Sequence, residues 1–137
     1  MKIFLVSCVK IKQSVPCEAG KMYTSDWFKK AKAYTKKHCD EWYILSAKYG
    51  LLRPDEIVTP YEETLLKKRK VERLKWADMV ITDLYKIISP QDEVTILAGL
   101  NYREFLTPWL EERGNKVIIP LEGLAIGKQK RWFNENK

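Results

Sequence analysis

The chain contains one histidine and three cysteines among its 137 residues. Cys8, Cys17 and Cys39 are irregularly spaced and form no CxxC pair, and His38 stands beside only one of them. A structural zinc site needs four ligands at characteristic spacings. We therefore expect no metal ion or other cofactor, and we expect the cysteines to be reduced thiols.

Long hydrophobic runs are also absent. No apolar stretch approaches the roughly 20 residues that a membrane span requires. Met1-Lys2 leads directly into a short apolar run, without the longer apolar region and cleavage site of a signal peptide. We expect a cytoplasmic protein with no membrane partner. Because hydrophobic residues make up 45% of the chain and no repeat or linker interrupts it, we expect a single domain over residues 1–137. The sequence does not indicate an oligomeric state.

Basic residues outnumber acidic ones, 25 against 18, for a formal net charge of +7. This excess favours an anionic partner such as a nucleotide, a nucleic acid or an acidic protein, although it is also compatible with a generally basic surface. Two basic clusters would follow the phosphates of a bound nucleic acid. They are Lys67-Lys68-Arg69-Lys70, on a predicted long helix, and Lys128, Lys130 and Arg131, in a predicted last helix.

Four short runs of β-branched, aromatic and other apolar residues are each followed by small or polar residues. They cover residues 2–6, 41–47, 94–97 and 117–119. Runs of this kind, bounded by turn residues, are typical of strands buried on both faces. Because helical patterns separate them, we expect an α/β fold with about four mainly parallel strands.

The predicted helices complete a single three-layer, Rossmann-like domain with helices on both faces of the sheet, the long middle helix covering one face. Capping residues, Pro and Gly mark their ends. The predicted helices run from Ser25 or Asp26 to His38, from Tyr61 or Glu62 to Ile88, from Thr107-Pro108 to Gly114, and beyond Gly123. We expect the stretch from Leu51 to Pro60 to be a loop with room for a small hairpin.

In sheets of this type, ligands bind outside the carboxyl ends of the strands, where the strand order reverses. Ser7, Cys8, Lys10 and Lys12 follow the first strand. The lysines would hold a phosphate or carboxylate. They would also lower the pKa of the Cys8 thiol, which makes Cys8 a candidate nucleophile. The alternative is that Cys8 is a small buried apolar residue, because no His, Asn or Asp is identifiable as its partner.

Two further segments are predicted to reach the same edge. Tyr23 and Ser25 precede the first helix, whose free backbone N–H groups would attract an anion; the alternative for Ser25 is a plain N-cap. The end of the second strand carries a cluster of candidate site residues: Ser46, the candidate catalytic Lys48, Tyr49 as a stacking face or phenol donor, and Gly50. The alternative is that this segment is only a turn with a buried tyrosine.

The third strand ends in Ala98-Gly99-Leu100-Asn101-Tyr102-Arg103, a small-residue end suited to nucleotide binding. Gly99 allows close approach, Asn101 can read a base edge, and Tyr102 can stack on the base. Arg103 completes this ligand-binding group. Tyr61 and the neighbouring Glu62 or Glu63 supply polar and acidic groups to the site. The carboxylate would act as a base, as an acceptor for a ribose hydroxyl, or only as a salt-bridge partner.

Several motifs in order resemble a family of small bacterial and phage proteins of unknown function, distantly related to the YaaA peroxide-stress proteins. The likeness spans nearly the whole chain, and Ser46-Ala47-Lys48-Tyr49-Gly50-Leu51 is its most specific element. The other elements are Ser7-Cys8-Val9-Lys10-Ile11-Lys12, Met22-Tyr23-Thr24-Ser25-Asp26-Trp27-Phe28, Pro60-Tyr61, and Ala98-Gly99 with Tyr102-Arg103.

A fainter likeness links the first of these elements to archaeosine synthase, which adds lysine to a nitrile-bearing deazaguanine in tRNA. That enzyme carries a Pro-Cys-Ser…Lys-Pro-Tyr-Ser motif. The resemblance implies Cys8, Lys10 or Lys12, Tyr23 and Ser25 as the equivalent group. This chain has Val6-Ser7-Cys8 where that enzyme has Pro-Cys-Ser, and no Pro-Tyr follows its lysine. The resemblance therefore implies a shared type of ligand more than a shared reaction.

Three hypotheses follow. We favour an enzyme that acts on a nucleobase, nucleoside or nucleotide, in modified-base metabolism, with Cys8 or Lys48 performing the chemistry. The second is a nucleic-acid-binding protein, in keeping with the net charge and with the DNA association attributed to YaaA. The third is a sensor or phage interaction module that captures a small nucleotide and leaves it unchanged.

Overall fold

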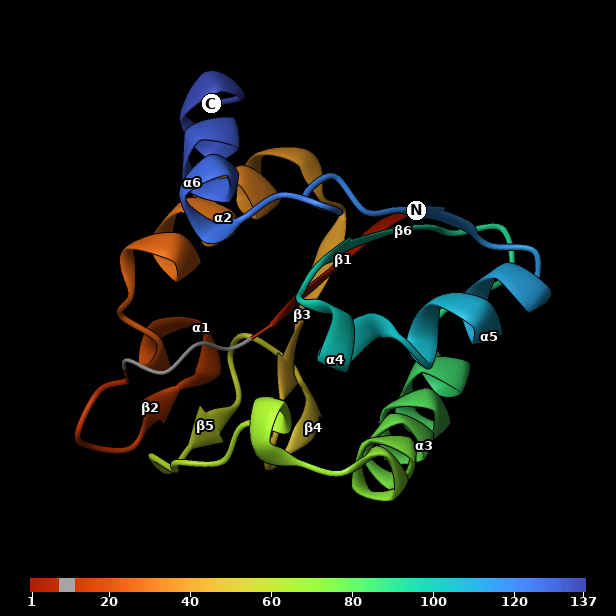
Figure 1. Cartoon of the computed structure of the whole chain (residues 1–137), viewed down its shortest axis with the longest axis horizontal. Helices are drawn as coiled ribbons and strands as arrows, with labels where there is room; N and C mark the ends of the chain where they lie inside the picture. The colour runs from red at the N-terminus through yellow and green to blue at the C-terminus, as the bar shows by residue number, and fades with distance from the viewer. Residues whose placement is uncertain (8–11) are drawn as a thin grey trace.

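The computed structural model describes residues 1–7 and 12–137. Within them, a five-stranded sheet forms the centre of the molecule (Figure 1). Its strand order is β4 (Gly50–Leu52), β3 (Glu41–Ser46), β1 (Lys2–Ser7), β6 (Glu93–Leu97) and β7 (Lys116–Ile118). β4 pairs with β3 in antiparallel fashion, and all the other neighbouring strands of this sheet are parallel. The α/β class and the mainly parallel sheet predicted from the sequence are confirmed, and β4 is an additional strand.

The strands form because their side chains are buried on both faces of the sheet. Ile3 and Leu5 of β1 point to opposite faces from Phe4 and Val6, and all four are almost completely buried. Such strands need apolar residues at successive positions rather than alternating ones, as the sequence indicated. A second, two-stranded sheet pairs β2 (Cys17–Glu18) with β5 (Ile57–Val58), and β5 lies in the stretch that was predicted to be a loop.

Helices cover both sides of the sheet (Figure 1). α2 (Asp26–His38) and α6 (Ile126–Glu135) pack together on one side. α3 (Lys70–Ile87), α4 (Leu100–Arg103) and α5 (Leu106–Glu112) lie on the other. A four-residue helix, α1 (Ala19–Met22), lies next to the small sheet.

The start of α2 agrees with the prediction. Ser25 is its N-cap, and the Ser25 Oγ accepts a hydrogen bond of 3.1 Å from the backbone N–H of Phe28. A cap of this kind satisfies one of the N–H groups that a helix start leaves without a partner. The capping residue in the sequence therefore located this helix correctly.

The predicted start of the long helix at Tyr61 or Glu62 is wrong. α3 begins at Lys70, and a 3₁₀ turn, η1 (Leu65–Lys67), precedes it. The basic cluster of residues 67–70 therefore contributes only its last member to α3. Tyr61 is 7% exposed and Leu65 1% exposed, so the core holds this segment in a conformation that helix periodicity does not anticipate. Tertiary packing overrides local helix propensity here.

The predicted start of α5 is also wrong. The helix begins at Leu106, with Phe105 as its N-cap, so Thr107 and Pro108 occupy the second and third helical positions. Proline is tolerated there because N–H groups in the first turn have no intrahelical acceptor. Leu106 is fully buried, and this burial favours a helix that starts two residues earlier than predicted. Gly114, with φ +97°, follows the helix end as predicted.

The topology places the strand-order reversal between β1 and β6. From β1 the chain crosses to β3 on one side, then returns to β6 on the other side of β1. Ligand sites in open α/β sheets lie outside the carboxyl ends of such strands. Across the described residues, no helix combines the length and apolar character that a membrane crossing needs. The same residues include no group of three or more His, Cys, Asp or Glu side chains placed to hold a metal ion.

Tyr43, in β3, provides a test of the buried sheet. Burial, together with a hydrogen bond of 2.8 Å from its hydroxyl to Glu41, raises the pKa of Tyr43 from 10.0 to about 12. The unfolded chain loses this phenolic proton first, so stability should fall as the pH rises from 10 to 12. Urea denaturation over this range should show a shallower decline for Tyr43→Phe than for the wild type. Equal slopes would mean that the phenol is solvated in the folded protein.

Candidate functional site

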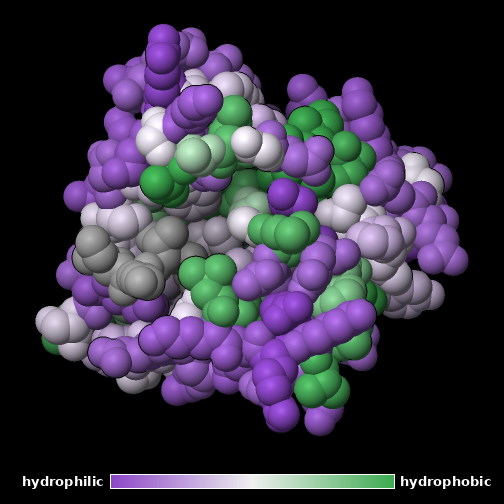
Figure 2. Space-filling view, viewed as in Figure 1, coloured by the Kyte–Doolittle hydropathy of each residue, from purple (hydrophilic) through white to green (hydrophobic). Residues whose placement is uncertain are grey.

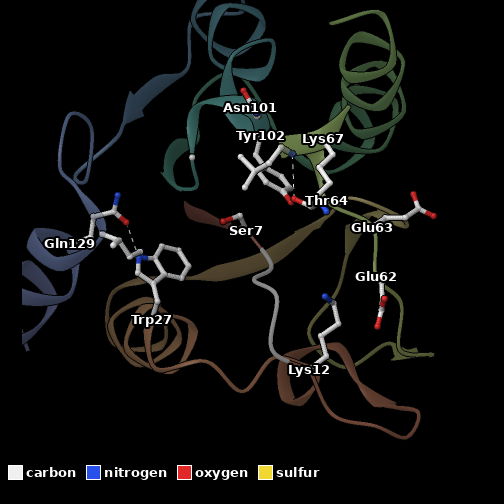
Figure 3. Close-up of a pocket in the computed structure, with 13 residues that line it drawn as sticks. Ser7, Lys12, Trp27, Glu62, Glu63, Thr64, Lys67, Asn101, Tyr102 and Gln129 are labelled. Carbon is white, nitrogen blue, oxygen red and sulfur yellow. Dashed lines mark hydrogen bonds between the residues drawn. The ribbon is translucent and has the colours of Figure 1, made fainter. Parts of the chain in front are cut away.

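A cavity of about 600 Å³ lies at the carboxyl edge of the sheet, beside the strand-order reversal. Figure 2 shows this face of the molecule hollowed near its centre, with hydrophobic residues bordering the hollow. The side chains around the cavity are drawn in Figure 3. The described residues that line it are Ser7, Lys12, Trp27, Glu62, Glu63, Thr64, Leu66, Lys67, Gly99, Asn101, Tyr102, Ile126 and Gln129.

Two neighbouring strand ends contribute one wall. Ser7, which is buried, ends β1, and Gly99 and Asn101 follow β6 into α4. A Cβ at Gly99 would meet nothing within 4 Å, so the backbone is open to close approach. The buried ring of Tyr102 packs edge-on against Trp76, with ring centres 5.6 Å apart. A hydroxyl, an amide and an aromatic ring thus stand around an accessible space.

The second wall comes from the starts of α2 and α6. The indole Nε1–H of Trp27 donates a hydrogen bond of 2.8 Å to Gln129 Oε1 (Figure 3). The Gln129 amide Nε2 in turn donates a 2.8 Å bond to the carbonyl of Leu124. The Trp27 ring also meets Phe133 edge-on. Because both ends of the Gln129 side chain are bonded, the amide and the indole hold one another in fixed orientation.

The third wall is the segment that enters η1. Thr64 caps this turn by accepting a bond of 3.3 Å from the backbone N–H of Leu66. Lys67 and Lys12 bring cationic groups to the cavity from different elements. Glu63 points outward in Figure 3 and forms a 3.6 Å ion pair with Lys68. The two lysines are the cations of the described lining, which also contains the carboxylates of Glu62 and Glu63.

A buried hydrogen-bond network supports the cavity next to Lys12. Ser46 Oγ donates a bond of 2.7 Å to the Tyr61 hydroxyl, which lies 2.7 Å from the Tyr23 hydroxyl. Ser46 Oγ also accepts a 3.1 Å bond from the backbone N–H of Tyr49. The Lys12 ammonium lies 4.8 Å from the centre of the Tyr61 ring, a cation–π contact. These bonds tie the end of β3 to the segments that carry Lys12 and Tyr61.

The structure thus brings many of the predicted site residues together. Cavity-lining residues among them are Ser7, Lys12, Lys67, Gly99, Asn101 and Tyr102. The adjoining network holds Tyr23, Ser46 and Tyr61. Two of the predicted residues, Cys8 and Lys10, lie outside the described residues.

Ser25 and Arg103 are engaged elsewhere. Ser25 caps α2. The Arg103 guanidinium donates a 3.2 Å bond to the carbonyl of Ala98 and lies 3.7 Å from Glu122. Both therefore have structural partners at the edge of the site, and neither is among the residues found to line the cavity.

The turn between β3 and β4 also lies outside the described lining. The Lys48 side chain is exposed, with its ammonium 5.3 Å from the centre of the Tyr49 ring. The Tyr49 hydroxyl donates to the carbonyl of Thr59 at 3.2 Å. Gly50, with φ +75°, adopts the conformation that glycine was expected to provide, and its Cα faces Met79. These contacts account for the three residues as parts of a folded turn.

Of the two predicted basic clusters, only Lys67 is among the described residues that line the cavity. The second cluster belongs to α6, which contributes Ile126 and Gln129 to the lining. Several side chains of both clusters form ion pairs with nearby carboxylates. The hydrogen bond from Arg69 lowers the pKa of Glu72 from its ordinary value. The ion pairs are Lys68 with Glu63 and Glu72, Arg69 with Glu72, Lys130 with Asp26, and Arg131 with Glu135.

Sequence reasoning missed Trp27, Thr64 and Gln129 as site residues. Trp27 is a buried core residue, but it also directly follows a helix start that was predicted to meet a ligand. Gln129 lies in the helix that follows the fourth strand, and ligands of such sheets bind outside the carboxyl ends of the strands. The cue in both cases was position after a strand or helix terminus. Thr64 had no cue, because its segment was predicted to be helical.

Comparison with known proteins identifies relatives without an assigned activity. The Family of unknown function (DUF6884) matches residues 3–135. An uncharacterized protein of Bacillus subtilis (strain 168), YfjM, is 33% identical over 98 residues. That alignment covers 71% of this chain but only 65% of YfjM, so the similarity spans less than two thirds of that relative. No solved structure matches.

Proposed function

This chain belongs to DUF6884, a family of unknown function, and we propose that it is an enzyme that binds a nucleobase, nucleoside or nucleotide at the carboxyl edge of its sheet. The observation that carries the proposal is the combination of two aromatic residues, Trp27 and Tyr102, with two lysines, Lys12 and Lys67, around one cavity. Bases stack on aromatic rings, and ammonium groups bind phosphate.

The polar groups suit the same class of ligand. The Asn101 amide has both a donor and an acceptor, as a base edge requires. Open backbone at Gly99 would let a phosphate or sugar approach. The volume of about 600 Å³ is within the range of small-molecule sites. The size of the cavity, its aromatic rings and its two lysines therefore support a nucleotide as the ligand.

The proposal also includes a Rossmann-like fold and kinship with the YaaA proteins. The strand order reversing at β1, with helices on both sides of the sheet, supports the first. The motif from Ser46 to Leu51 supports the second. We place the chemistry next to Ser7, where Cys8 follows in the chain, rather than at the exposed Lys48.

The binding step is tested by thermal shift at moderate salt, against nucleobases, nucleosides, nucleotides and deazaguanines. A ligand that binds only the folded state raises Tm by mass action. One chemical class should raise it, and Trp27→Leu should weaken binding of that ligand about 10- to 100-fold through lost stacking. Trp109→Leu, on α5 and away from the cavity, is the matched control. No shift from any ligand, or equal losses in both variants, would contradict the proposal.

Turnover is tested with the ligand so identified. Cys8→Ser should retain binding and lose product formation, because the alcohol is a far weaker nucleophile than a thiolate. Product formation is measured by chromatography of the ligand after incubation. Recovery of unchanged ligand from the wild type would instead support a sensor that captures a nucleotide without altering it.

A further inference from the structure

The net charge of the protein is concentrated on two helices. α2 contains five lysines and one aspartate. Residues 126–137, which include α6, contain three lysines, one arginine and one glutamate. Together they have a formal charge of +7, which is the net charge of the whole chain. The remaining residues contain equal numbers of basic and acidic side chains, so the excess positive charge lies on α2, on α6 and on Lys137, which follows α6.

These helices form one continuous surface because their aromatic side chains interlock. Tyr34 of α2 lies with its ring centre 5.0 Å from Trp132 and 6.0 Å from Phe133, both of α6. Lys30 Nζ donates a bond of 2.8 Å across the pair to Asn134 Oδ1. Figure 1 shows the two helices side by side, and Figure 2 shows hydrophilic side chains over the end of α6. The lysines of both helices therefore share one side of the sheet.

A second cavity, of about 370 Å³, lies between the two helices. Lys29, Lys37 and Lys137 line it together with Tyr34 and Phe133, and its described lining includes no acidic residue. Within the part of the chain that the structure describes, these three lysines form no ion pair, and all three are exposed. They are thus available to an anionic partner, in contrast to the locally paired residues 68 and 69.

We propose that the surface formed by α2 and α6 binds the phosphate backbone of a single-stranded nucleic acid, with a base entering the cavity beside Tyr34. Proteins that bind such strands combine a positively charged groove with aromatic rings. An anionic membrane would favour exposed apolar side chains as well, whereas Ile126 is the one large exposed hydrophobic residue found on these helices. The lysine–aromatic combination favours a polynucleotide.

This inference is independent of the proposed function, because it concerns a different cavity. The two sites are nonetheless neighbours. α2 and α6 both begin at the larger cavity, where Trp27 and Gln129 meet, and the smaller cavity lies further along the pair. A strand bound along the helices would therefore have one end near the larger cavity.

The experiment measures binding of a fluorescent 20-nucleotide single strand by anisotropy across a salt series. The test variant is Lys29→Gln/Lys37→Gln/Lys137→Gln. The matched control, Lys2→Gln/Lys75→Gln/Lys86→Gln, removes the same charge from exposed positions outside the helix pair, at the start of β1 and on α3. Both variants should keep the wild-type Tm, which is measured first.

The test variant should bind at least about tenfold more weakly at low salt, and its salt slope should be smaller by about 2, since each lost contact with a single strand removes about 0.7. The control should keep the wild-type affinity and slope. Equal losses in both variants would show that only net charge matters and would overturn the proposal. So would the absence of binding at low salt.

Competition identifies the class of partner. Polyglutamate of equal charge and vesicles containing phosphatidylserine should compete more weakly than unlabelled oligonucleotide. Equal or stronger competition by either would overturn the assignment in favour of an acidic protein or a membrane. Free nucleotides should shift the Tm of the test variant as they shift the wild type, so the two proposals can fail separately.

Discussion

Trp76→Ala is expected to lower the free energy of unfolding by about 3–5 kcal/mol, the range for removal of a buried large aromatic side chain. Trp76 is 6% exposed and packs edge-on against Tyr102. Its indole N–H also donates a buried hydrogen bond of 2.8 Å to the carbonyl of Ser46. One side chain therefore joins α3 to the end of β3 and to the cavity wall. Urea denaturation monitored by circular dichroism measures the loss.

Two variants separate packing from hydrogen bonding. Trp76→Phe keeps most of the ring but leaves the Ser46 carbonyl without this donor, so we expect a smaller loss of about 1–3 kcal/mol. Trp109→Ala removes a half-buried tryptophan from α5 and should cost less than Trp76→Ala. If Trp76→Ala and Trp109→Ala were equally destabilising, α3 would not dock on β3 as described.

Gly50→Ala is expected to lower the free energy of unfolding by about 1–2 kcal/mol. At φ +75° an alanine pays about 1–2 kcal/mol for its left-handed conformation. Its Cβ would also lie 2.7 Å from the Met79 Cε. Because this is the end of a flexible and exposed side chain, the methionine can move aside and the contact adds little to the loss. Thermal and urea denaturation would measure the change.

Gly127→Ala is the matched control for this substitution. Gly127 lies in the first turn of α6, and a Cβ there would meet nothing within 4 Å. Alanine is favoured over glycine in helices by up to about 1 kcal/mol, so this variant should be neutral or more stable than the wild type. A similar loss in both variants would contradict the turn geometry at Gly50.

The cavity and the basic helix pair imply different roles for the positive charge. In the cavity, Lys12 and Lys67 are single cations among aromatic and amide groups, an arrangement suited to orienting one small anion. On α2 and α6, many lysines share one surface, which suits a polyanion. Ligand and strand binding can therefore be separated by substitutions that do not overlap.

The sequence determined the parts of the fold that depend on short-range patterns. Apolar runs located β1, β3, β6 and β7, because buried parallel strands need apolar side chains at successive positions. The N-cap Ser25 located α2, and Gly114 located the end of α5, because both act within a single turn. Since all parallel strands end at one edge, the sequence also predicted where the cavity lies.

Only the tertiary structure decided which of those residues meet. Tyr61 was predicted to begin a helix, but it hydrogen-bonds to Ser46 and Tyr23 and lies outside any helix. The Trp27–Gln129 bond joins residues 102 positions apart, and no local pattern encodes such a pairing. The same limit applies to charge. The sequence shows a net charge of +7, but the packing of α2 against α6 determines that this charge forms one surface.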